Sequence, residues 1–203
     1  MVSRRQTLLA LTASLWAPGA HALARCGAHD AKGVRRCEAG IDRDLSDAVA
    51  TAVGSQHMSQ WCWAASIEMI FRFYGYVVPQ ADIVRIAWGS PVNMPGSLEQ
   101  ILRSLNLVWI DAYRRQFRVE SLPYGPNPMP AILDLQRNWP LIIGTMHHAM
   151  VLTSLLYDVD NFDRVAVRAA RVRDPWPGAG RRVLRAEEWH TRQFFARIRV
   201  FHG

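Results

Sequence analysis

Residues 56–66 read Q-H-M-S-Q-W-C-W-A-A-S, and the interpretation of the chain depends on them. This stretch places Cys62 between two tryptophans, directly before three small residues that begin a helical pattern. From Trp61 to Tyr74 the apolar residues have the spacing of a buried helical face, and Gly75 is the expected C-terminal cap. A single cysteine near a helix start is most often a small buried hydrophobe. However, a thiol at a helix N-terminus lies at the positive end of the helix dipole, which stabilises a thiolate.

The bulk composition indicates one globular domain. The chain has 203 residues, of which 50% are hydrophobic and 20% are charged, and its net charge is +7. Lys32 is the only lysine, so nearly all of the positive charge comes from arginine. No lysine-rich run or zinc-finger spacing accompanies this charge, and we expect no nucleic-acid partner. Association with an anionic cell envelope is a hypothesis, although a solvated arginine face is the simpler interpretation of the basic C-terminal third.

The first residues have the features of an export signal. Arg4 and Arg5 precede an apolar run, and residues 22–24 (A-L-A) supply the small-x-small pattern of signal-peptidase cleavage. Residues 3–6 (S-R-R-Q) also resemble a twin-arginine signal. We therefore predict a signal peptide over residues 1–24 and a periplasmic or secreted protein.

Export affects the prediction for the three cysteines. Cys26 and Cys37 bracket a short polar segment that contains glycine, and an oxidising compartment lets them pair. Such a bridge would contribute about 2–3 kcal/mol in the chain-entropy account. Cys62 would then be the free thiol, whereas a Cys26–Cys62 bridge is the alternative that would remove its chemistry. The chain is thus divided into a signal peptide, a short N-terminal segment with this disulfide over residues 25–54, and one domain over residues 55–203.

The local patterns predict helices first and strands afterwards. After the helix that begins near Cys62, Ser97 and Gln100 have the spacing of a capping box. Expected helices cover 80–88, a segment that opens at Ser97, and 129–138; expected strands cover 141–143, 148–153, 164–168 and 196–201. This order predicts an α+β fold with an antiparallel sheet.

Two further segments supply groups that can act on a thiol. His147 and His148 enter a strand, where neighbours face opposite ways, so only one of them can address Cys62. Each also fits a core histidine without a catalytic role. Asp174 begins D-P-W-P-G after the next strand, which taken alone is turn chemistry. An acid there can accept a hydrogen bond from an imidazole Nδ1–H and stabilise the imidazolium, with Trp176 shielding the contact from water.

In order and in secondary structure, these three groups resemble the papain-like cysteine peptidases. The similarity is to the bacterial branch that includes secreted avirulence effectors of plant pathogens and bacteriocin-leader peptidases. Three motifs carry it: Q-x5-C-W-A-A-S at residues 56–66, H-A-M-V-L from His148, and D-P-W-P-G from Asp174. The resemblance covers residues 56–201 and implies a helical half, with the nucleophile on a helix start, packed on the C-terminal sheet.

By position, the resemblance implies a role for four residues. Cys62 would be the nucleophile, His148 the base and Asp174 the orienting acid. Gln56 would donate its side-chain amide to the oxyanion hole beside the backbone N–H of Cys62. Gln60 competes for this role but lies too close to Cys62 in sequence to reach the same hole. The implied substrate is a protein or peptide, and no cofactor or metal is expected.

Other functions are compatible with the same residues. The triad also fits a peptidoglycan amidase or an acyltransferase, and the fold also fits an exported binding or inhibitor module with an inert Cys62. A zinc site from Cys62, His147 and His148 is disfavoured, because adjacent histidines on a strand diverge and no CxxC or HxxxH spacing accompanies them. Trp61 and Trp63 are expected to anchor the core rather than to contact substrate.

Overall fold

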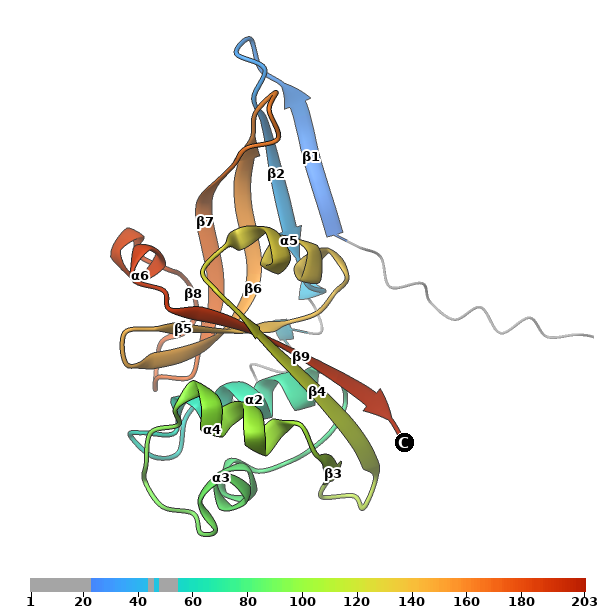
Figure 1. Cartoon of the computed structure of the whole chain (residues 1–203), viewed down its shortest axis with the longest axis vertical. Coiled ribbons are helices and arrows are strands. Elements are labelled where there is room, and N and C mark those ends of the chain that lie inside the picture. Colours follow the sequence, from blue (N-terminus) through green and yellow to red (C-terminus); the bar gives the residue numbers. More distant parts are fainter. Residues whose placement is uncertain (1–22, 44–45, 48–54) are drawn as a thin grey trace, which may run out of the picture.

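The computed structural model describes residues 23–43, 46–47 and 55–203 (Figure 1). The signal-peptide prediction falls almost wholly on residues 1–22, outside this part of the chain. Within the described ranges, no helix has the length and apolarity needed to cross a membrane. The strands are β1 (Leu23–His29), β2 (Arg35–Gly40), β3 (Val108–Ile110), β4 (Gln116–Tyr124), β5 (Leu141–Thr145), β6 (His148–Val159), β7 (Val165–Asp174), β8 (Gly180–Val183) and β9 (Phe194–His202). The helices are α2 (Cys62–Phe73), α3 (Gln80–Trp88), α4 (Leu98–Leu105), α5 (Pro128–Gln136) and α6 (Ala186–His190).

The architecture is α+β, as predicted, and is built on one antiparallel sheet. The strand order is β1-β2-β6-β5-β9-β4-β3, with β7 also pairing with β6 and β8 pairing with β7. In Figure 1, α2, α3 and α4 gather at one end of the molecule, while the hairpin of β1 and β2 extends beside β6 and β7 at the other. α2 packs against β5 and β6, α4 packs against β4, and α3 packs on α2 and α4.

The predicted division into a helical first half and a sheet in the second half is wrong. The first described residues, 23–40, form the hairpin of β1 and β2, and β3 and β4 lie between α4 and α5. β2 pairs with residues 154–159 of β6, and β4 pairs with β9 along its whole length. These strands form through partners more than 70 residues away in sequence, so their local patterns give little indication of them.

Strand β6 organises the sheet around the candidate site. Its first part, residues 148–152, pairs with β5, and residues 154–159 pair with β2. On its other edge β6 pairs with β7 from Val151 to Val159, with a bulge between Leu152 and Ser154. His148 is the first residue of β6, and Asp174 is the last residue of the neighbouring β7. The two side chains thus start close together on adjacent strands.

Most helix predictions are confirmed. α3 covers the predicted residues 80–88, and Ser97 caps α4 in a capping box with Gln100. α5 begins after Asn127, whose side chain accepts a hydrogen bond from Met129 N–H. In α2, the residues at 64, 65 and 66 are fully buried. Their small side chains allow β6 to pack closely against the first turns of the helix that begins at Cys62.

Candidate active site

Cys62 is the first residue of α2 and is partly exposed. The N-cap is Trp61, whose side chain can donate a hydrogen bond but cannot accept one. It therefore does not cap the N–H groups at the start of the helix. The first turn also contains no acidic residue. No acidic side chain of the turn itself therefore neutralises the positive end of the helix dipole at Cys62.

The disulfide prediction is confirmed. Cys26 and Cys37 face each other in the pairing of β1 with β2 and are bonded, and Cys62 is a free thiol. The alternative Cys26–Cys62 bridge is therefore wrong. A disulfide of this kind persists mainly in oxidising compartments.

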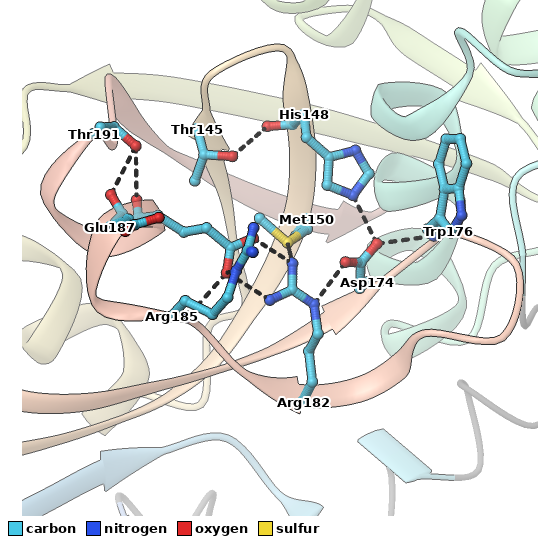
Figure 2. Close-up of polar contacts among 10 residues, drawn as sticks. Thr145, His148, Met150, Asp174, Trp176, Arg182, Arg185, Glu187 and Thr191 are labelled. Carbon is cyan, nitrogen blue, oxygen red and sulfur yellow. Dashed lines mark hydrogen bonds and ion pairs between the residues drawn. The ribbon is translucent and has the colours of Figure 1, made fainter.

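His148 lies between Asp174 and Cys62. Its Nε2 is 2.7 Å from Asp174 Oδ1 (Figure 2). The Cys62 side chain also interacts with the His148 ring and raises the pKa of the imidazole. The expected use of Nδ1 toward the acid is wrong, because Nε2 makes that contact. His147 lies instead in the turn between β5 and β6, with φ of 59°, and its side chain is exposed. The two histidines are thus separated by the turn rather than by alternation along a strand.

The surroundings of His148 favour its charged form. Burial pulls the pKa of His148 down, but the interactions with Asp174 and Cys62 outweigh it and raise the pKa from 6.5 to about 9. The Trp176 ring stands edge-on to the imidazole, with 6.5 Å between ring centroids. Trp176 is half exposed, so its ring lies beside the imidazole while it stays in contact with solvent.

Asp174 is almost completely buried and accepts three hydrogen bonds. Oδ1 accepts from His148 Nε2 and from the backbone N–H of Trp176 at 2.9 Å, and Oδ2 accepts from Arg182 Nε at 2.7 Å (Figure 2). Burial raises the pKa of Asp174, but these hydrogen bonds outweigh it and the pKa is lowered overall. The carboxylate is therefore ionised and fixed in orientation at neutral pH.

Two further hydrogen bonds hold the three segments of the site together. Ser66 Oγ, one helical turn after Cys62, donates to Ala149 O next to His148 at 3.2 Å. The backbone N–H of Gln56 donates to Pro175 O next to Asp174 at 2.8 Å. The helix start, the histidine strand and the acid turn are thus linked in pairs.

The side chain of Gln56 is buried in the loop that precedes Cys62. Its Nε2 donates to Met58 O at 3.0 Å and to Ser59 O at 2.9 Å, which engages both amide hydrogens. Its Oε1 is buried and has no hydrogen-bond partner within the described residues. The side chain of Gln60 is exposed instead. In this structure Gln56 therefore braces the loop.

Trp61 and Trp63 are buried, which confirms the prediction that they anchor the core. Their indole N–H groups donate to Val92 O and Met94 O at 2.9 and 3.3 Å. The two tryptophans therefore fix the loop before α4 against the start of α2.

Sequence reasoning missed several polar residues that support the site. Gln80 is fully buried, accepts from the N–H of His57, and donates to Ser55 O and to Glu68 Oε2. On the other side, Arg182 and Glu188 support Asp174, so Arg182 does not belong to the solvated arginine face expected for the basic C-terminal third. The roles of Gln80, Arg182 and Glu188 follow from their burial and their contacts in the fold. The local sequence around each of these residues reveals neither. In the part of the chain that the structure describes, no three His, Cys, Asp or Glu side chains are grouped to hold a metal.

Comparisons with known proteins add little. No protein family model matches the chain, and no curated protein matches its sequence. Among solved structures, a double-glycine motif protease from an AMS/PCAT transporter, in complex with the leader peptide, is similar in fold at 18% identity and a TM-score of 0.44. The match covers 73% of this chain and 89% of that one. Similarity at this level carries no functional inference for this chain.

The raised pKa of His148 predicts a pH-dependent contribution to stability. Because the folded pKa of about 9 lies above the unfolded value near 6.5, the contribution is fully present below about pH 6.5 and is lost as pH rises through about 9. The difference in unfolding free energy between the native chain and a His148→Gln variant should therefore shrink by about 1–3 kcal/mol between about pH 6 and about pH 10. Urea unfolding of both chains at several pH values measures this difference in unfolding free energy. A His147→Gln variant is the control, since that side chain lies in an exposed turn. A difference for His148→Gln that does not change with pH would contradict the assignment.

Proposed function

We propose that this chain is an exported cysteine peptidase that hydrolyses peptide bonds with Cys62, His148 and Asp174. The observation that supports this most strongly is the position of His148, which contacts a buried, ionised carboxylate at 2.7 Å and interacts with a free thiol that helps to raise its pKa. This is the arrangement of a nucleophile, its base and the group that orients the base. The Cys26–Cys37 disulfide supports export to the periplasm or beyond.

In the proposed reaction, the Cys62 thiolate attacks the carbonyl carbon of the scissile peptide bond. The protonated His148 then donates its proton to the leaving amine as the C–N bond breaks, which leaves a thioester on Cys62. A water molecule attacks the thioester carbonyl while His148 accepts its proton. The carboxylic acid product leaves, and the thiolate and the imidazolium are restored.

The developing oxyanion needs donors near Cys62. The backbone N–H of Cys62 belongs to the first turn of α2, where N–H groups have no partner within the helix. We propose the Gln56 amide as the second donor. For this, one of its N–H groups must turn from the carbonyl of Met58 or Ser59 toward the substrate.

The proposal predicts that Cys62→Ala abolishes hydrolysis. The native chain should digest casein, and the variant should lose at least about 10³-fold of that activity while its unfolding free energy changes little. Release of peptides from casein and of fragments from purified sacculi is measured side by side. A Cys62→Ala chain that still digests casein would overturn the proposal. Digestion of sacculi alone would identify a peptidoglycan amidase, and no digestion of either by a chain whose Cys62 resists alkylation would indicate an inert binding module.

Gln56 provides a second test, with Gln60 as its matched control. If the Gln56 amide binds the oxyanion, Gln56→Ala should lower kcat on casein by about 100-fold or more. Gln60→Ala should leave kcat within about threefold, because its side chain is exposed. If Gln56 only braces the loop, the variant would lose thermal stability while a folded sample kept near-native kcat. That outcome would remove Gln56 from the oxyanion hole.

A further inference from the structure

We propose that Arg182 and Glu188 act as a positioning pair that holds the Asp174 carboxylate in place for His148. This inference rests on the proposed function of Cys62 and His148. It assigns to Arg182 a role that neither its sequence context nor the triad pattern indicates.

The guanidinium of Arg182 is held on three sides (Figure 2). Its Nε donates to Asp174 Oδ2 at 2.7 Å. Its Nη1 and Nη2 donate to the two carboxylate oxygens of Glu188 at 2.8 and 2.7 Å, and Nη2 also lies 3.2 Å from Met150 Sδ. These contacts hold the planar Arg182 guanidinium in one orientation. The guanidinium in turn fixes the orientation of the Asp174 carboxylate.

Glu188 is itself fixed by the start of α6. Its Oε2 accepts a hydrogen bond from the backbone N–H of Arg185 at 2.9 Å. Its contact with Arg182 lowers the pKa of Glu188 to about 2, so it is ionised wherever the protein is folded and active. Arg182 thus meets a carboxylate of fixed charge and position on the side away from Asp174.

The charges alternate along the whole chain of contacts. The signs alternate from the His148 imidazolium through Asp174 and Arg182 to Glu188. The Cys62 thiolate of the proposed function would extend this series at its other end. Because Glu188 neutralises Arg182, the guanidinium orients Asp174 without placing an unbalanced positive charge behind the imidazolium. Without Arg182, the buried Asp174 and the partly buried Glu188 would face the same space, and repulsion would raise the pKa of Asp174.

Most other arginines of the C-terminal third are not placed in this way. The side chain of Arg185 is 76% exposed and touches only Glu188 among the acids of the site, whereas that of Arg182 is 26% exposed and touches both carboxylates. Arg185 therefore provides a matched control that shares one partner but does not contact the triad.

Alkylation of Cys62 by iodoacetamide as a function of pH tests the inference without a known substrate. The chain has three cysteines and two are bridged, so the reagent reports Cys62 alone. In Arg182→Met, the pH of half-maximal alkylation should move up by about 1–3 units, because Asp174 becomes protonated at higher pH and no longer supports the imidazolium. On casein, kcat should fall at least about tenfold with KM within about twofold, since Arg182 acts through Asp174.

Two further variants separate positioning from folding. Arg185→Met should keep the native alkylation profile and kcat. Arg182→Lys keeps the positive charge but loses the planar guanidinium, so this variant should fold. Its pH of half-maximal alkylation and its kcat on casein should be intermediate between those of Arg182→Met and the native chain. A native alkylation profile in folded Arg182→Met would overturn the inference. If Arg182→Met does not fold, native values for Arg182→Lys would overturn it. If the proposed peptidase function fails with Cys62→Ala, the alkylation shift still decides this inference.

Discussion

The hydrogen bond between His148 and Asp174 is the contact on which the candidate site depends. It joins the start of β6 to the end of β7, and its 2.7 Å length is reached because these two strands pair along most of their length. Asp174 is buried, so its charge is stable only because all of its donors are in place. The charged imidazole that results is the group a thiolate at Cys62 needs as its partner.

The rest of the site brings Cys62 to this pair. Small residues after Cys62 let α2 approach β6, and Ser66 fastens the helix to the strand next to His148. In the loop before Cys62, the backbone N–H of Gln56 donates to Pro175 O in the acid turn. The next N–H, that of His57, donates to the side chain of the buried Gln80. These contacts involve main-chain groups at one end at least, so they position the segments without requiring long side chains to stay ordered.

The sequence indicated which candidate residues lie together better than it indicated the strands of the sheet. The residues of the proposed triad lie together, and the start of α2 and the capping box of α4 are local features with local signals. β2 and β4 pair with β6 and β9, which are distant in sequence, and β1 and β3 are short hairpin partners of these two strands, so all four were missed. The assignment of a ring nitrogen to the acid was wrong, since the sequence does not fix the side-chain orientation of His148. Arg182 could not be distinguished from solvated arginines, since only the fold places it between two carboxylates.

The most direct test of the account is covalent trapping with an epoxide-type thiol inhibitor, followed by peptide mass spectrometry of the modified chain. The account predicts one adduct per chain, on Cys62, formed by the native protein and strongly slowed by His148→Ala, with loss of activity in step with labelling. An unmodified Cys62 in a protein that still hydrolyses its substrate would contradict the account. Equal labelling rates of the native and His148→Ala chains would contradict it as well, because the reactivity of the Cys62 thiol would then not depend on His148.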